Sequence, residues 1–230
     1  MLANEAGALI TLEQSRVVIL LCQELRRVLV PANAERLTLS RGYLMKSVSQ
    51  LHWDYFLLLE RDLVKIAETL ELSERNYHAY GPRIVQLILT AGSEIDVALK
   101  SLANAICPDD EAARKERPSM GDFKRMLVAH MDKDFFSSRV MFLRSDIVLI
   151  PWESLDMNPN GKIGWWDRYN SIKHRRSKNY ERADLKTALE LMGALFLVDS
   201  YLAKAENDDH LGSTQIIDHD WRDEMCNVFE

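Results

Sequence analysis

The residues best suited to chemistry lie between positions 162 and 182, in the stretch KIGWWDRYNSIKHRRSKNYER. It has seven Lys and Arg residues against two acids, whereas the whole chain has a formal net charge of −6. An imidazole titrates near neutral pH, so His174 could move a proton on or off a ribose 2′-hydroxyl. A guanidinium nearby could stabilise the charge that forms on a phosphate in the transition state. These residue types therefore indicate RNA as the ligand and phosphodiester cleavage as the chemistry.

A helix that begins near Trp165 would sort this stretch into two faces. Trp165, Tyr169 and Ile172 recur at spacings of four and three residues, so we expect them to pack inward. Asn170 and His174 are one turn apart on the opposite face. Four cations surround that face and are predicted to bind substrate: Lys173, Arg175, Arg176 and Lys178. The alternative is a solvated cationic helix whose histidine has no special role.

Three longer helical patterns must position this stretch, over about 43–72, 82–106 and 183–205. Shorter ones cover 11–30 and 119–131. Pro82 suits the first turn of a helix, and the apolar stripe that follows it is the clearest in the chain. Residues 138–153 are rich in Val, Ile, Leu and Phe around a polar centre, which predicts a small β-hairpin. The sequence therefore predicts a mainly α fold, a helical bundle with a small β-hairpin insertion.

We divide the chain into three parts. An N-terminal helix and its connection cover 1–42, the helical bundle covers 43–205 with its β insertion at about 138–153, and an acidic C-terminal tail covers 206–230. The tail has eight acids and a single Arg. We expect either a solvated tail or one that competes with RNA for the basic stretch.

Several classes of protein are disfavoured by the sequence. The phosphate-binding, dinucleotide-binding, zinc-protease and serine-nucleophile motifs G-x-x-x-x-G-K-[ST], G-x-G-x-x-G, H-E-x-x-H and G-x-S-x-G are absent. The three cysteines are far apart, so we expect no disulfide framework, no metal site and no cofactor. No apolar run is long enough to span a bilayer, and the N-terminus lacks a secretory pattern. We expect a reduced cytoplasmic protein that does not associate with membranes.

The run DRYNSIKH, followed by Arg175 and a long helix with the pattern ALELMGALFLVDSYL, resembles the HEPN superfamily. Two earlier segments, YFLLLERDLVKIAETL and ILTAGSEIDVALKSLANAI, look like the preceding helices of such bundles. The family signature is an Arg and a His separated by a few residues, here Arg168 and His174 with five between them. The resemblance covers about 45–205. It implies a HEPN-like helical bundle, often a homodimer, and in many members a metal-independent endoribonuclease that serves as a toxin or in antiviral defence.

The resemblance also implies a role for each site residue. His174 would be the catalytic acid and base, Arg168 would bind phosphate, and Asn170 would orient the histidine or the substrate. Glu94 and Asp96 would support the site, and we expect Glu94 to face the basic helix and hold Arg168 or Lys173. Two copies of that helix would line a shared cleft in the dimer. An antitoxin or a defence-system protein would be a further partner.

On a regular helix, residues six apart such as Arg168 and His174 differ by about 120° in direction. They can meet at one phosphate only if the helix begins after Arg168, or if Arg175 or a second subunit supplies the guanidinium. Three functions therefore stay open. They are an endoribonuclease, a non-catalytic HEPN-like module that binds RNA, a nucleotide or a protein, and an interaction protein that docks its basic helix on an acidic partner.

Overall fold

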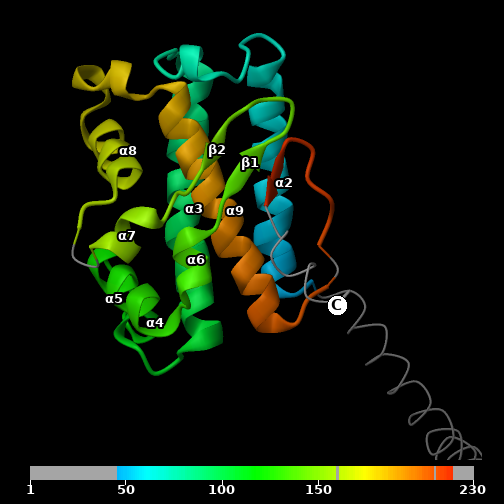
Figure 1. Cartoon of the computed structure of the whole chain (residues 1–230). Helices are drawn as coiled ribbons and strands as arrows, with labels where there is room; N and C mark the ends of the chain where they lie inside the picture. The colour runs from blue at the N-terminus through cyan, green and yellow to red at the C-terminus, as the bar shows by residue number, and fades with distance from the viewer. Residues whose placement is uncertain (1–45, 159–160, 210, 220–230) are drawn as a thin grey trace, which may run out of the picture. The chain divides into compact units, whose positions relative to one another are not determined.

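The computed structural model describes residues 46–158, 161–209 and 211–219 (Figure 1). Our prediction of an N-terminal helix and connection at 1–42 lies outside the described residues, as does the end of the predicted acidic tail at 220–230.

Three long helices form the centre of the fold (Figure 1). They are α2 (Val48–Ala67), α3 (Pro82–Ile106) and α9 (Leu185–Glu206), and α9 packs against both of the others. The bounds predicted for α3 are confirmed at both ends, with Pro82 at its first turn. Its predicted apolar stripe is buried from Ile84 to Leu102, which is what fixes this helix against its neighbours.

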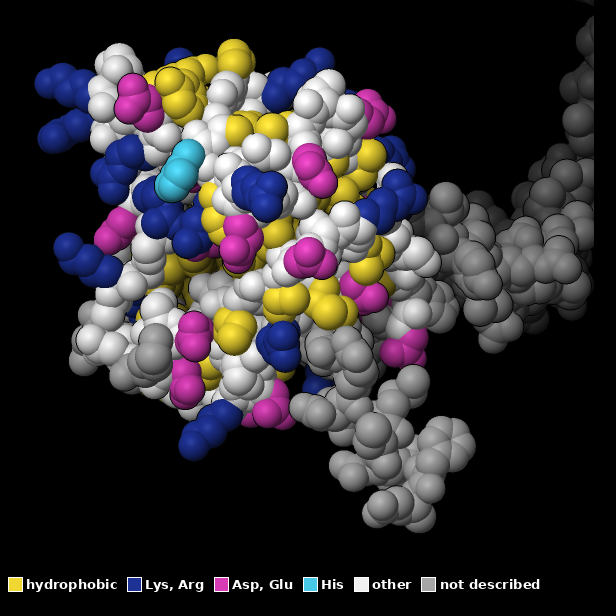
Figure 2. Space-filling model, turned by 45° about the horizontal axis from the view of Figure 1, so that its top comes forward, with side chains coloured by type: hydrophobic (Ala, Val, Ile, Leu, Met, Phe, Trp, Pro, Cys, Tyr) yellow, Lys and Arg dark blue, Asp and Glu magenta, His cyan; other side chains and the backbone are white. Residues whose placement is uncertain are grey.

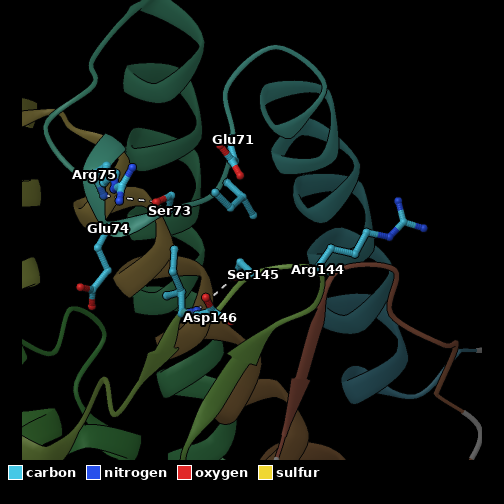
Figure 3. A pocket seen from close by; sticks show the side chains of 9 residues that line it. Glu71, Ser73, Glu74, Arg75, Arg144, Ser145 and Asp146 are labelled. Atoms are coloured by element: carbon cyan, nitrogen blue, oxygen red, sulfur yellow. Dashed lines mark hydrogen bonds between the residues drawn. The ribbon is translucent and has the colours of Figure 1, made fainter.

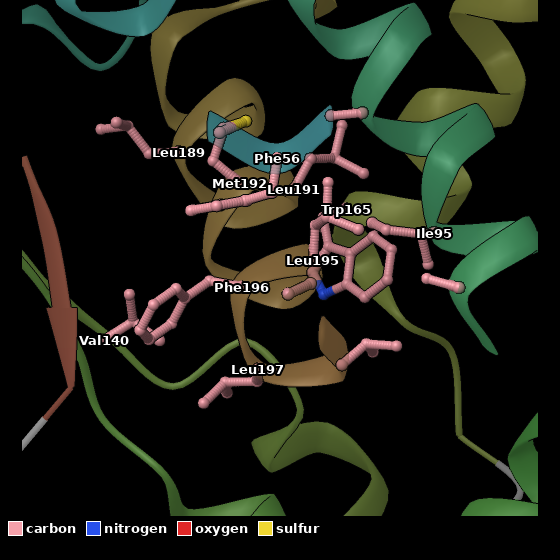
Figure 4. Packing of buried hydrophobic residues seen from close by; sticks show 14 of the residues in the cluster. Phe56, Ile95, Val140, Trp165, Leu189, Leu191, Met192, Leu195, Phe196 and Leu197 are labelled. Carbon is pink, nitrogen blue, oxygen red and sulfur yellow. The ribbon is translucent and has the colours of Figure 1, made fainter. Parts of the chain in front are cut away.

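Helix α9 is apolar around most of its circumference, as expected for a helix that is enclosed by other elements. Figure 4 shows its side chains projecting in several directions into the core. Buried residues on this helix include Leu189, Leu191, Met192, Leu195, Phe196 and Leu197. Phe196 also joins Trp53 and Phe56 of α2 in an aromatic cluster, with ring centroids 5.2 to 5.7 Å apart. Each such contact adds to the burial of apolar area.

Four short helices and a small helix of the basic stretch connect α3 to α9 (Figure 1). They are α4 (Glu111–Arg114), α5 (Met120–His130), α6 (Lys133–Ser137), α7 (Glu153–Met157) and α8 (Gly164–Arg175). Helix α5 was predicted, and it begins with a capping box between Ser119 and Asp122. Helices α4, α6 and α7 were not predicted, because four or five residues are too few to show a helical period.

The predicted β-hairpin is present and is extended by a third strand. Strands β1 (Val140–Phe142) and β2 (Val148–Leu149) pair antiparallel, and β3 (Ile217–His219) pairs with the other edge of β1. The third strand comes from the segment that we expected to be a solvated or inhibitory tail. That expectation is wrong for residues 215–219, because Ile216 and Ile217 are buried in the core.

A buried carboxylate holds this third strand in place. Glu60 of α2 accepts hydrogen bonds from the backbone N–H groups of Gln215, Ile216 and Ile217, at 2.8, 2.9 and 3.1 Å. Trp53 donates to the carbonyl of Gly212 at 2.7 Å. The segment after α9 is therefore part of the fold as far as β3.

No helix in the described part of the chain is both long and apolar enough to cross a membrane.

Candidate nucleic-acid interface

Helix α8 packs against α3 and α9 at one side of the bundle (Figure 1). Trp165, Tyr169 and Ile172 are buried, which confirms the inner face that their spacing predicted. Trp165 also donates a hydrogen bond from Nε1 to the carbonyl of Pro151 at 2.8 Å. Gly92 of α3 lies against the ring of Tyr169, and a methyl group there would overlap that ring. The inner face thus fixes the direction in which the other face of α8 points.

The C-terminal end of α8 and the 3-10 turn that follows it, η2 (Arg176–Lys178), form an exposed cationic segment. We call residues 173–178 the basic segment. All of its side chains are exposed, and none of its cations forms an ion pair with a described residue. Figure 2 shows Lys and Arg side chains gathered at the left edge of the view, the side on which α8 lies in Figure 1. Its positive charge is therefore open to a ligand.

Arg168, in contrast, is already engaged inside the protein. Its Nε donates to Thr187 Oγ1 of α9 at 2.8 Å, and its Nη2 forms an ion pair with the carboxylate of Glu190. Both members of this pair are largely buried, with 26% and 18% of their side chains exposed. Burial raises the pKa of Glu190, and the charge of Arg168 opposes that rise. Arg168 therefore links α8 to α9 and has its charge neutralised there.

His174 and Asn170 lie where the sequence placed them, but Arg168 does not meet His174. Helix α8 begins at Gly164, before Arg168, so both residues belong to one regular helix. Their side chains then differ by about 120° in direction. His174 is exposed and makes no hydrogen bond with the described residues, and Asn170 is half-buried one turn before it. Within one chain, Arg175 is the arginine next to His174.

The supporting carboxylates of α3 are arranged differently from our expectation. Glu94 does not hold Arg168 or Lys173, because its Oε1 lies 2.6 Å from Nδ1 of His52 on α2. Asp96 is the carboxylate that interacts with the basic helix. Burial raises the pKa of Asp96, and the positive charge of Lys173 opposes that rise without cancelling it.

The reason for this reversal is the geometry of α3. Residues two apart on a helix point in nearly opposite directions, about 200° apart. Helices α2 and α8 lie on opposite sides of α3, so Glu94 faces one and Asp96 faces the other (Figure 1). The sequence shows that these two carboxylates diverge, but not which neighbour lies on which side.

His52 also contacts Ser101, whose Oγ lies 2.9 Å from its Nε2. The order carboxylate, imidazole and hydroxyl is that of a serine nucleophile with its base. Ser101 lies inside α3, however, before its last turn, where the neighbouring N–H groups are used in helical hydrogen bonds. We therefore interpret Glu94, His52 and Ser101 as a polar link between α2 and α3. His52 had no sequence signal for this role, since its partners are more than forty positions away.

A pocket of about 690 Å³ lies between the loop after α2 and the turn between β1 and β2 (Figure 3). Its lining mixes charges of both signs, and Figure 3 shows Arg144 pointing away from the other side chains. The charged residues are Glu71, Glu74, Arg75, Arg144 and Asp146. None of the predicted site residues lines this pocket. In the described part of the chain, no group of three or more His, Cys, Asp or Glu residues could hold a metal ion.

Comparisons with protein-family models, with curated proteins and with solved structures found no match to this chain. The described part of the chain is mainly helical, with a small antiparallel sheet and an exposed basic segment.

Proposed function

We propose that this chain is a HEPN-like helical module that binds RNA, and that the RNA phosphates contact the basic segment. The observation that carries the proposal is the state of Lys173, Arg175, Arg176 and Lys178. All four are exposed and none forms an ion pair with a described residue, although the charge of Lys173 acts on Asp96. Cations that are not neutralised by the protein can replace the counterions of a phosphate backbone, which makes them the main source of affinity for nucleic acid.

The engagement of Arg168 favours binding over cleavage. The guanidinium of Arg168 donates from Nε to Thr187 and from Nη2 to Glu190, so its charge is already balanced by a carboxylate. Because Glu190 is largely buried, moving Arg168 onto a phosphate would leave that carboxylate without its cation.

A second candidate function is metal-independent cleavage of the bound RNA. The specific observation that favours it is His174, an exposed imidazole without a described hydrogen-bond partner, beside the free guanidinium of Arg175. In this reaction His174 would take the proton of a ribose 2′-hydroxyl, whose oxygen would bond to phosphorus while the P–O5′ bond breaks and the 5′-oxygen leaves with a proton from water. Arg175 or an arginine of a second subunit would stabilise the charged phosphate. A homodimer and an antitoxin or defence-system partner belong to this second candidate.

RNA binding can be tested by fluorescence anisotropy with a labelled single-stranded RNA at about 50 and 200 mM salt. The test variant replaces Arg175, Arg176 and Lys178 with alanine. We expect weaker binding and a shallower dependence on salt, by about two units of log Kd per log salt for three lost phosphate contacts. The matched control replaces three exposed cations outside the segment with alanine: Arg117, Lys133 and Arg139. Equal binding by the two variants would reject the proposal.

Cleavage can be tested separately with labelled RNA in EDTA. The second candidate predicts that the wild-type protein cuts RNA and that His174→Ala does not. His130→Ala is the matched control, because His130 is also an exposed histidine but lies on α5. An uncut RNA that still binds would select the non-catalytic module.

A further inference from the structure

A tyrosine next to the basic segment has an unusual position. Tyr80 is an aromatic residue with 50% of its surface exposed, directly before the turn that begins α3. Its backbone is nevertheless held firmly. Tyr80 forms an isolated antiparallel bridge with Asp184, and the N–H of Leu185 donates to the carbonyl of Ala79 at 2.8 Å. The ring is therefore presented to solvent from a fixed backbone.

A second tyrosine supports this ring. Tyr180 lies in the 3-10 turn η3 (Tyr180–Arg182), two residues after the basic segment ends. The two rings are perpendicular, with their centroids 5.8 Å apart. An edge-to-face pair of this kind uses the face of one ring and the edge of the other, and it restricts both rings. The exposed part of the Tyr80 ring is left for another flat group.

The surroundings of the two rings are cationic. Tyr180 lies between Lys178 and Arg182 in the sequence, and Arg83 follows Tyr80 in the first turn of α3; all three cations are exposed. Residues 173–182 contain five cations and one carboxylate, Glu181. Asp184 is largely buried, and its carboxylate is 3.7 Å from the ring of His78. A ligand that stacks on Tyr80 would therefore lie close to exposed cations, which favours an anionic ligand.

We propose that Tyr80, supported by Tyr180, is a stacking platform for an unpaired base, and that the ligand is single-stranded RNA. This inference rests on the proposed RNA binding and names its substrate class. The cations of the basic segment would attract the phosphates of any nucleic acid. An exposed aromatic ring adds selectivity for single strands over duplexes, because the flat face of a base is accessible only where the base is not stacked within a duplex.

The test compares three ligands of the same length: single-stranded RNA, the same backbone without bases, and blunt double-stranded RNA. Tyr80→Leu removes the ring but keeps an apolar side chain. We expect it to weaken binding of single-stranded RNA by about 5- to 100-fold, the usual effect of one stacked base. Binding of the RNA without bases should not change, because that ligand has nothing to stack. Tyr80→Trp should keep the affinity of the wild type.

The matched control is Tyr55→Leu, which alters another exposed tyrosine on α2. Its affinity should equal that of the wild type, and circular dichroism should show that both leucine variants are folded. If the wild type binds RNA and Tyr80→Leu binds single strands equally well, the stacking platform is refuted while the basic segment stands. If the wild type prefers the duplex, the substrate class is wrong. If the wild type binds none of the three ligands, RNA binding itself fails.

Discussion

The acidic residues at the end of α9 and the basic residues at the end of α8 differ in what neutralises their charge. Glu206 accepts a hydrogen bond from the N–H of Ser49 at 2.9 Å, and Asp208 accepts from the hydroxyls of Ser47 and Ser49 at 2.5 and 2.9 Å. These carboxylates lie at the N-terminus of α2, where the helix dipole favours negative charge. The basic segment has no described ion pair of any kind.

Two arginines of the basic stretch 162–182 show the same difference between a neutralised and an open charge. Arg168 is paired with Glu190 and links two helices, whereas Arg175 is exposed and unpaired in the described structure. A charge that the protein neutralises contributes to folding, and one that it leaves open is available for a ligand. Composition cannot distinguish the two, because both arginines belong to one basic run. The comparison therefore makes separate predictions for stability and for binding.

The largest effect on stability is expected from Glu60→Leu. This change removes the acceptor that Glu60 offers to three backbone N–H groups before and within β3, two of which belong to the buried residues Ile216 and Ile217. Leaving such groups without an acceptor should lower the free energy of unfolding by about 3 kcal/mol or more. Urea denaturation measures this, and Glu68→Leu, at the exposed C-cap of α2, should change it little. A loss no larger than that of Glu68→Leu would show that the pairing with β1 and the buried side chains hold β3 without Glu60.

Arg168→Met should cost about 2 kcal/mol of folding free energy, because it leaves the carboxylate of Glu190 largely buried without its cation. Arg175→Met should stay within about 0.5 kcal/mol, as for other exposed positions. RNA affinity should show the reverse order, with Arg175→Met the weaker binder. Denaturation and anisotropy on the same two proteins test this directly. A stable Arg168→Met that has lost RNA binding would mean that Arg168 contacts the ligand.

Asp199 of α9 is neither neutralised by the protein nor open to a ligand. Its carboxylate is fully buried and has no hydrogen-bond partner in the described structure. Burial, and then the charge of Glu94, raises the pKa of Asp199 well above its ordinary 3.8. At a pH above 3.8 the side chain of Asp199 loses its proton in the unfolded chain but keeps it in the folded protein. Stability should therefore fall as the pH rises from the ordinary pKa of an aspartate towards the raised pKa of Asp199. In Asp199→Asn this slope should be smaller, and the exposed Asp156→Asn should retain it. An unchanged slope in Asp199→Asn would assign the effect to other groups.

The smallest effect on stability is expected from His174→Ala, within about 0.5 kcal/mol, because the side chain is exposed on α8. Ile172→Ala, two residues earlier on the buried face, should cost about 2 to 4 kcal/mol through the cavity that it leaves. Thermal unfolding followed by circular dichroism compares the two. Loss of the helical signal in His174→Ala would contradict the two-faced description of α8.

The sequence by itself determined much of the local structure. The apolar period and Pro82 defined both ends of α3, and the spacing of Trp165, Tyr169 and Ile172 defined the buried face of α8. The turn-like residues between two apolar runs defined the hairpin. These features depend on contacts between residues that are close in the chain, so the sequence pattern contains them.

The tertiary structure alone decided what the charged residues contact. Glu94 and Asp96 were both candidates to support the basic helix, and the side of α3 on which α8 packs selected Asp96. The charge of Arg168 is neutralised by Glu190 of α9, which follows α8 after the 3-10 turns η2 and η3. Tyr80 meets Tyr180, two residues after the basic segment, because the loop before α3 pairs with the start of α9. Each of these outcomes depends on residues that are distant in sequence, and on which helices are neighbours. That choice is made by burial of the whole core, so it cannot be read from any single stretch.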